Sequence, residues 1–320
     1  MPRRSLVLYL LLTLGLGIGG APVLYFASWA GHVASCRHLD RPGAYLAYCE
    51  NTGFGSYEHD AYRFGLEPEA IRALQQAKIL FLGNSRLQYA FSTPQVDAFF
   101  AARATPYHLL GFGYGESSRF PRELIARYQP KPKVVIINAD PFFQSIFSPV
   151  AYEIAKAPLH ALADGVMKYT FDRIDPWRCR IPRLCTDTDP ATYRDRRTGQ
   201  WIWHGVLVPR DRVAGPITPT KASAWSDAAL PAWIHDGDTF LPTLDTPRDC
   251  ILLTGVPTPA IDAEAMAAAL GARLALAVVQ PVVPDLSAVD TSHLSADSAE
   301  RWSAAFLAQA APQIDACLAR

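Results

Sequence analysis

At residues 78–87 the sequence reads Lys78-Ile79-Leu80-Phe81-Leu82-Gly83-Asn84-Ser85-Arg86-Leu87. An apolar run without alternation is typical of a strand buried on both faces of a sheet. Gly83-Asn84-Ser85 then forms a sharp turn at the carboxyl end of that strand, the edge where open parallel sheets bind ligands. Ser85 is therefore a candidate nucleophile. A second interpretation makes Asn84 or Ser85 simply the N-cap of the next helix.

The chain around this stretch alternates between strand and helix patterns. Further strands are expected at residues 107–110, 133–137, 250–254 and 273–279. Helices are expected at residues 67–76, 92–102, 116–128, 262–270 and 295–309. Gly111 and Gly113 are expected in a turn after the second strand, and Gly271 is expected to end its helix. The order predicts an α/β fold with a five-stranded parallel sheet.

The pattern is interrupted for about a hundred residues in the middle of the chain. The 26 prolines concentrate there and predict ordered loops rather than regular helices, with a turn at residues 235–238. Residues 196–203 predict a β-hairpin built on Gly199. Long insertions after a sheet strand usually form lids or binding surfaces. The tryptophans of the insertion either stack on sugar rings or fill its own small core, and the sequence favours neither.

The N-terminus combines two arginines with a long uncharged segment. Arg3 and Arg4 precede a mostly apolar run from Ser5 to about His32, which is long enough to span a bilayer about 30 Å thick. No basic residue follows until Arg37, so the positive-inside rule places the rest of the chain outside the cytoplasm. A cleaved signal peptide is the alternative. In a bacterium, either interpretation predicts an exported domain, and the first predicts a single-pass inner-membrane protein facing the periplasm.

These patterns divide the chain into three parts. Residues 1–32 are the expected membrane anchor or signal peptide, and residues 33–76 a lead-in segment. Residues 77–320 are the expected α/β domain, with an insertion at about 141–248. The 30 basic residues balance the 30 acidic ones, which gives no reason to propose a nucleic-acid partner.

The six cysteines suit an oxidising compartment, where an even number suggests disulfides. Sequence proximity favours Cys36–Cys49 and Cys179–Cys185, which leaves Cys250–Cys317. Other pairings among the six, and buried free thiols, remain open at this stage. Zinc-type spacing is missing, so neither a metal nor another cofactor is expected.

Asp290 and His293 lie three residues apart in the loop after the last predicted strand. In a parallel sheet this loop reaches the same edge as the turn that holds Ser85. A serine hydroxyl needs an imidazole to take its proton, and a carboxylate to hold the imidazole in the correct tautomer. One short loop therefore supplies both the base and the residue that orients it.

Together these motifs resemble the SGNH, or GDSL, hydrolase superfamily over roughly residues 77–307. The matching blocks are Gly83-Asn84-Ser85, the glycine turn at Gly111 or Gly113, and Asp290-Thr291-Ser292-His293-Leu294. The resemblance implies a three-layer, flavodoxin-like α/β/α fold. It also implies Ser85 as nucleophile, His293 as base and Asp290 as the residue that orients the base.

Two positions depart from the family pattern. Asn84 stands where the family usually has Asp. The third block, normally Gly-x-Asn-Asp, reads Asn138-Ala139-Asp140 here, so Asn138 lies one residue away from the family's oxyanion position. The expected oxyanion donors are the backbone N–H of Ser85, the N–H of Gly111 or Gly113, and the Asn138 side chain.

An anchor before such a domain resembles proteins that acylate or deacylate cell-surface polysaccharide, including the alginate acetylation proteins. Some of these work with a membrane-bound O-acyltransferase. The expected function is therefore that of a serine-dependent O-acyltransferase or acyl esterase, which takes an acyl donor and a glycan as substrates. The alternative is a non-catalytic, membrane-tethered assembly or glycan-binding module of the same fold.

Overall fold

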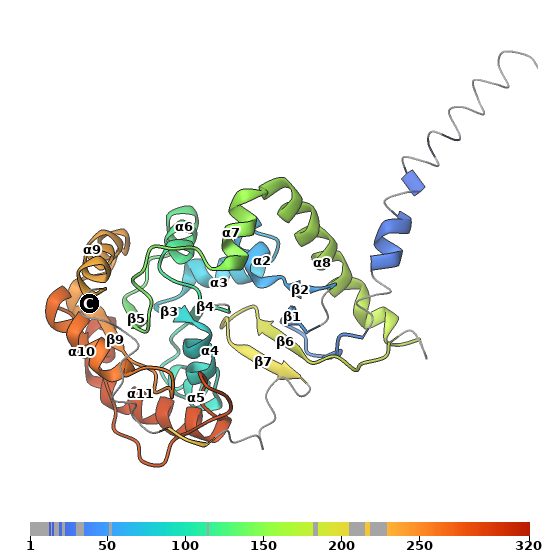
Figure 1. Ribbon diagram of the computed structural model, residues 1–320. Helices are drawn as coiled ribbons and strands as arrows, with labels where there is room; N and C mark the ends of the chain where they lie inside the picture. Colours follow the sequence, from blue (N-terminus) through green and yellow to red (C-terminus); the bar gives the residue numbers. More distant parts are fainter. Residues whose placement is uncertain are drawn as a thin grey trace, which may run out of the picture.

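A five-stranded parallel sheet forms the centre of the fold, in the order β10-β9-β5-β3-β4 (Figure 1). The computed structural model describes residues 13, 15, 19–20, 23–29, 35–50, 53–113, 115–181, 185–204, 215–217 and 229–320. The sheet consists of β3 (Ile79–Asn84), β4 (Tyr107–Phe112), β5 (Val134–Asn138), β9 (Ile251–Thr254) and β10 (Ala277–Val278). The chain adds β4 on one side of β3 and the later strands on the other. This reversal lies between β3 and β5, where the carboxyl ends of doubly wound strands leave a crevice.

Helices cover both faces of this sheet. Leu80 and Leu82 of β3 face a core shared with α3 (Pro68–Gln76), α6 (Arg119–Tyr128), α9 (Leu230–Phe240) and α10 (Ala263–Leu274). Ile79 and Phe81 face the opposite core, shared with α4 (Ser85–Phe91), α5 (Pro94–Ala101) and α11 (Ala296–Leu318). The alternation of β3 thus separates two apolar layers, and the arrangement is a three-layer α/β/α fold.

A second, antiparallel sheet stands beside the first, in the order β2-β1-β6-β7. Its strands are β2 (Gly55–Ser56), β1 (Ala44–Cys49), β6 (Ala191–Asp195) and β7 (Trp201–His204). Residues 33–76 and the insertion at 141–248 therefore build this sheet together. Around it lie α2 (Glu58–Phe64), α7 (Pro149–Lys156) and α8 (Pro158–Arg178), as Figure 1 shows. The remaining elements are β8 (Gly215–Pro216), β11 (Ser287–Ala288) and the 3₁₀ helices Leu241–Thr243 and Arg248–Cys250.

The middle of the chain follows the sequence prediction only in part. The hairpin is confirmed, because β6 and β7 pair directly on either side of Gly199. The expectation of loops is wrong, since α7 and the 21-residue α8 occupy this region. Pro149 and Pro158 stand in the first turns of these helices, where a missing N–H costs nothing. Residues 235–238 lie inside α9 rather than in a turn.

Gly271 does not end its helix. α10 continues to Leu274, and the left-handed residue after it is Ala275, with φ of 52°. A Cβ on Gly271 would lie 2.3 Å from Cγ2 of Val278, so glycine is required there for close packing of α10 on β10. The strand expected at residues 273–279 shortens accordingly to two residues.

All three predicted disulfides form. Cys36–Cys49, Cys179–Cys185 and Cys250–Cys317 close sequence separations of 13, 6 and 67 residues. The third joins the 3₁₀ helix just before β9 to the last turn of α11.

The predicted membrane anchor, residues 1–32, lies mostly outside the described residues. Within the part of the chain that is described, no helix is both long and apolar enough to cross a bilayer. Residues 23–29 are helical, and Trp29 at their end packs edge-on against Phe171 of α8 with ring centroids 5.6 Å apart.

Candidate active site

The turn after β3 depends on a glycine. A Cβ on Gly83 would lie 2.8 Å from Cβ of Leu87 and 3.2 Å from Cβ of Asn138. No side chain fits between β3, β5 and the first turn of α4 at that position. Gly83 therefore lets α4 start directly at the end of the strand, with Ser85 as its first residue.

Asn84 fixes the same turn through both ends of its amide. Its Oδ1 accepts a hydrogen bond from the backbone N–H of Arg86 at 2.9 Å, which makes Asn84 the N-cap of α4. Its Nδ2 donates to the carbonyl of Asp140 at 2.7 Å, after β5. The N-cap interpretation thus holds for Asn84, and it leaves the hydroxyl of Ser85 free for another partner.

That partner is His293, from the loop between β11 and α11. Ser85 Oγ lies 2.8 Å from His293 Nε2, and His293 Nδ1 lies 2.8 Å from Asp290 Oδ2. Asp290 Oδ1 accepts the backbone N–H groups of Ser292 and His293, both at 2.7 Å. A carboxylate only accepts, so Nδ1 carries the imidazole proton and Nε2 accepts the serine proton. The structure therefore brings the three predicted residues together in one hydrogen-bonded chain.

The same contacts stabilise the ionised form of Asp290. Partial burial opposes ionisation of Asp290. Even so, the hydrogen bond from His293, the charge of that imidazole and the two backbone donors lower the pKa of Asp290 to about 2. Asp290 is therefore a carboxylate at any pH near neutrality.

Tyr89 covers the imidazole from the other side. It follows Ser85 by one helical turn on α4, so both side chains project from the same face of the helix. Its ring stacks on that of His293, with centroids 4.1 Å apart and an angle of 23°. The imidazole of His293 is thus confined between Asp290, Ser85 and an aromatic ring.

Arg86 ties the nucleophile turn to the acid–base loop. Its Nε donates to Oγ of Ser292 at 2.8 Å, and its Nη1 pairs with Oδ2 of Asp140. Asp140 is fully buried, and burial raises the pKa of Asp140 to about 6 although Arg86 opposes the rise. Arg86 thereby holds β3, β5 and the loop of His293 in one arrangement.

Ser85 lies where two cavities meet. One, of about 220 Å³, is mostly apolar and also contains His293. Its other lining residues come largely from the second sheet and α4, and include Ala47, Tyr48, Tyr89, Thr192, Trp201 and Trp203. The other cavity, of about 380 Å³, is more polar and contains Arg86, Asp140, Gln144, Trp233 and Ser292. The Ser85 side chain can therefore be reached from two chemically different sides.

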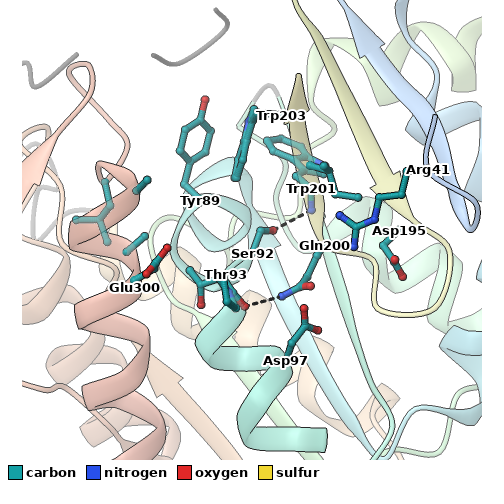
Figure 2. Close-up of a pocket in the computed structure, with 15 residues that line it drawn as sticks. Arg41, Tyr89, Ser92, Thr93, Asp97, Asp195, Gln200, Trp201, Trp203 and Glu300 are labelled. Carbon is teal, nitrogen blue, oxygen red and sulfur yellow. Dashed lines mark hydrogen bonds between the residues drawn. The ribbon is translucent and has the colours of Figure 1, made fainter. Parts of the chain in front are cut away.

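A third cavity, of about 490 Å³, adjoins the apolar one (Figure 2). The two share Tyr89, Trp201 and Trp203, which we call the aromatic wall. Trp203 lies 4.8 Å from the ring of Tyr89, and Trp201 crosses Trp203 almost perpendicularly at 6.3 Å. The third cavity also carries the polar residues Arg41, Thr93, Asp97, Asp195, Gln200 and Glu300. Trp201 and Trp203 of the insertion thus line cavities rather than fill a closed core.

The predicted oxyanion donors differ in whether their N–H groups are already hydrogen-bonded within the protein. Ser85 is the first residue of α4, so its backbone N–H has no acceptor within the helix. Gly113 lines the apolar cavity, but its N–H donates to Glu58 Oε1 at 3.1 Å. Gly111 lies inside β4 opposite Gly83, because this strand runs two residues further than expected.

Asn138 is fully buried at the end of β5 and lines neither cavity that contains Ser85. Its Oδ1 accepts the backbone N–H of Val256 at 3.1 Å. Its Nδ2 has no hydrogen-bond partner among the described residues. The side-chain oxygen of Asn138 thus accepts a hydrogen bond from the segment after β9, while its amide nitrogen makes no hydrogen bond among the described residues.

Glu58 is a residue of the site that sequence reasoning missed. Its Oε2 accepts from Trp201 Nε1 at 2.9 Å and from Arg194 Nη1 at 2.8 Å, while its Oε1 holds Gly113. This buried carboxylate therefore positions both the glycine turn and the aromatic wall. Nothing local marks Glu58, which lies far from all its partners in sequence. Tyr89 was recognisable in principle, as an aromatic residue one turn after the serine.

Comparison with known proteins adds no identity to this site: no protein-family model, no curated protein and no solved structure matches the chain.

Proposed function

We propose that this chain is an exported serine-dependent acyl-ester enzyme, an O-acyltransferase or acyl esterase, that acts through Ser85, His293 and Asp290. The observation that carries the proposal is the pair of 2.8 Å contacts from Ser85 Oγ to His293 Nε2 and from His293 Nδ1 to Asp290 Oδ2. A serine with this pair of partners is the arrangement that activates a hydroxyl for acyl transfer.

The geometry sets the order of proton movements. As Ser85 Oγ attacks the acyl carbonyl, its proton passes to His293 Nε2, and Asp290 stabilises the resulting imidazolium. His293 then gives this proton to the leaving alkoxide as the carbon–oxygen bond of the donor breaks, which leaves an ester on Ser85. In the second half, His293 takes a proton from water or from an acceptor hydroxyl, whose oxygen attacks the acyl-serine. The bond from the acyl carbon to Ser85 Oγ then breaks, and His293 returns the proton to Ser85 Oγ.

The two cavities at Ser85 suit a reaction with two organic groups. The apolar cavity of about 220 Å³ has room for a short acyl chain, and the polar cavity of about 380 Å³ for an oxygen-rich group. A simple hydrolase needs only water as its second reactant, whereas a transferase needs a place for the acceptor. The second cavity supplies the space that an acceptor needs in acyl transfer, and in an esterase the two cavities would hold the two halves of the substrate.

A glycan is the substrate class that the aromatic wall supports best. Sugar rings present apolar C–H faces to aromatic side chains and hydroxyls to carboxylates and amides. The cavity of about 490 Å³ offers both, with Trp201 and Trp203 on one side and Asp97, Asp195 and Glu300 nearby (Figure 2).

The resemblance to the SGNH superfamily supports the same proposal, as does the sheet order, which is that of flavodoxin-like folds. The apolar run at residues 5–32 supports an inner-membrane anchor with the domain in the periplasm of a bacterium. Three disulfides agree with an oxidising compartment. A membrane-bound O-acyltransferase is the partner we propose as the source of acyl groups.

Labelling with a fluorophosphonate probe tests the serine. We expect the wild-type chain to be labelled, Ser85→Ala to lose the label, and His293→Ala to be labelled far more slowly because the hydroxyl is no longer activated. Ser145→Ala, a serine that lines neither of the two cavities, is the matched control and keeps the wild-type rate. Labelling that survives Ser85→Ala would show that another serine reacts.

Hydrolysis and transfer are then separated by incubating the wild-type chain with an acetyl ester and candidate oligosaccharides. A transferase adds an acetyl group to the oligosaccharide, detected by mass. Release of free acetate alone would rule out transfer to those acceptors.

One observation favours the non-catalytic alternative. The N–H of Gly113 and the Oδ1 of Asn138 are already bound within the protein, which reduces the donors ready for an oxyanion. Removing one oxyanion donor typically costs about 10²–10³ in rate. A folded wild-type chain that is not labelled under conditions where a known serine esterase is labelled would favour this alternative.

A further inference from the structure

Helix α8 has its polar residues on the inside. Lys168 is buried, donates to the carbonyl of Ser56 at 2.7 Å and pairs with Asp164 at 2.6 Å. Asp172 accepts the backbone N–H of Leu46 in β1 at 2.8 Å, and Asp175 lies 3.0 Å from His38. These bonds attach α8 to the second sheet and to the segment before it. They act together with Phe171, the apolar residue of α8 that is buried in the core.

A close helix–helix approach strengthens this attachment. A Cβ on Gly165 would lie 2.9 Å from Cβ of Asp60 and 3.0 Å from Cδ1 of Leu66. Glycine is therefore needed for α8 to lie against α2. The orientation of α8 is fixed by this contact and by its ion pairs, so its outer face is a defined surface.

That outer face is apolar. Leu159, Val166, Ile174 and Trp177 are 82%, 44%, 45% and 68% exposed, and Ile181 just beyond the helix is 54% exposed. The spacings of seven, eight and three residues within the helix place the first four on one side. We call these five residues the outer stripe. At 1.5 Å per residue it runs along a helix about 30 Å long.

The polar groups beside the outer stripe do not interrupt it. Thr170 lies within it, but its hydroxyl donates to the carbonyl of Val166 at 2.7 Å. Arg180 lies over the ring of Trp177 at 4.9 Å. Exposed apolar surface of this extent marks a site that another apolar body covers.

The position of residues 23–29 indicates that a lipid bilayer covers the outer stripe. Residues 23–29 reach the fold at α8, where Trp29 contacts Phe171 (Figure 1). Val23, Leu24 and Tyr25 are exposed by 65%, 73% and 63%. The apolar run that would enter a bilayer therefore joins the protein at α8, the helix that carries the outer stripe.

We propose that α8 is an interfacial helix that lies in the plane of the bilayer, with the outer stripe among the lipid headgroups and upper acyl chains. This rests on the part of the proposed function that places residues 5–32 in a membrane. Trp177 and Arg180, at one end of the outer stripe, suit the headgroup region, where the polar ends of both side chains stay in contact with water. Lys156 and Arg180 are exposed close to it and favour anionic lipids.

Two membrane contacts, the anchor and α8, would fix the orientation of the domain more completely than the anchor alone. Since α8 is bonded to β1, and β1 lines the apolar cavity at Ser85, the bilayer would hold this cavity at a constant height. That arrangement suits a substrate handed over by a membrane-embedded donor.

The test uses the full chain in phosphatidylethanolamine–phosphatidylglycerol vesicles that contain lipids brominated either near the headgroup or near the end of the acyl chain. The anchor keeps every variant on the vesicle, so quenching of tryptophan emission reports where each tryptophan lies. We expect shallow bromines to quench more than deep ones, and Trp177→Phe to remove much of the shallow quenching. Trp203→Phe, in the aromatic wall, is the control and leaves the quenching unchanged.

Equal quenching in wild type and Trp177→Phe would overturn the inference. So would a change from dimer to monomer in Val166→Glu/Ile174→Glu, because the stripe would then be an interface between two copies. Ser85→Ala is expected to be quenched like wild type. Carbonate-resistant vesicle binding without quenching through Trp177 would overturn the role of α8 and leave the anchor standing. A wild-type chain that shows the expected quenching but is not labelled by the fluorophosphonate probe would contradict the proposed role of Ser85 and support the proposed role of α8.

Discussion

At the scale of single residues, the site consists of a reactive chain and a set of side chains that hold it. Ser85, His293 and Asp290 form the chain, which was predicted from the Gly-x-Ser turn, the Asp-x-x-His loop and the resemblance to the SGNH superfamily. Tyr89 and Arg86 hold it without taking part in proton transfer. They neighbour Ser85 in sequence, yet their roles depend on contacts with a loop some two hundred residues away.

Tyr89 gives the first prediction at this scale. Tyr89→Ala is expected to lower kcat and the rate of fluorophosphonate labelling by about 3- to 10-fold, because a stacked aromatic pair is worth about 0.5–1.5 kcal/mol. Tyr89→Phe keeps the stacked ring and is expected to restore both rates. Steady-state kinetics on a soluble acetyl ester measures the effect.

Two comparisons make this result specific. Tyr152→Ala removes an exposed tyrosine of α7 and should leave the rates unchanged. If Tyr89→Phe were as slow as Tyr89→Ala, the hydroxyl rather than the stacked ring would be responsible.

At the scale of elements, the three disulfides close loops of very different length. Cys250–Cys317 joins the residue before β9 to the last turn of α11 across 67 residues, whereas Cys179–Cys185 spans only 6 at the end of α8. In the chain-entropy view, a cross-link stabilises by restricting the unfolded chain, and it does so more for a longer loop. Of these two disulfides, Cys250–Cys317 should therefore contribute more to the unfolding free energy.

We predict that the double variant Cys250→Ala/Cys317→Ala loses about 4 kcal/mol of unfolding free energy, and Cys179→Ala/Cys185→Ala about 2 kcal/mol. Urea unfolding under oxidising conditions measures both. Wild type unfolded with reductant should be less stable than either double variant. An equal or larger loss in the Cys179/Cys185 variant would contradict the loop-length explanation.

At the scale of the whole molecule, His108 lies where the two sheets meet. It is fully buried in β4, with Nε2 at 2.7 Å from the hydroxyl of Tyr62 and Nδ1 at 3.0 Å from the carbonyl of Arg197. Burial and the nearby charge of Arg194 lower the pKa of His108 to about 3. The carbonyl of Arg197 can only accept, so His108 is neutral with its proton on Nδ1.

This shift makes stability depend on pH. An imidazole in the unfolded chain titrates near 6.5, so between about pH 6.5 and 3 the unfolded state binds more protons than the folded state. The contribution of neutral His108 to the unfolding free energy is therefore complete above pH 6.5 and decreases as the pH falls toward 3. We predict that His108 contributes up to about 1.4 kcal/mol per pH unit to this decrease.

His108→Asn should therefore show a weaker loss of unfolding free energy than wild type between pH 6.5 and 4, even though it is less stable at neutral pH. Urea unfolding across this range measures the two slopes. His160→Asn, which removes an exposed imidazole of α8, should keep the wild-type slope. Parallel curves for His108→Asn and wild type would show that another group causes the acid sensitivity.

Local patterns determined much of this protein. Continuous apolar runs identify β3, β4, β5 and β9, because a strand buried on both faces has no polar side to alternate with. The Gly-x-Ser turn and the Asp-x-x-His loop predicted three side chains that lie in contact, since parallel strands bring their carboxyl ends to one edge. Proximity in sequence favoured two of the three disulfides, and Cys250–Cys317 was the pair that remained.

The tertiary structure alone decided the surroundings of the site. The second sheet joins residues 44–49 to residues 191–204, and no local pattern encodes that pairing. The same holds for Glu58, for the aromatic wall and for the buried polar face of α8. Their partners are distant in sequence, and only packing specifies which buried charges meet. A sequence predicts which residues react when a turn or a loop contains them, whereas the cavities around them exist only once distant segments have come together.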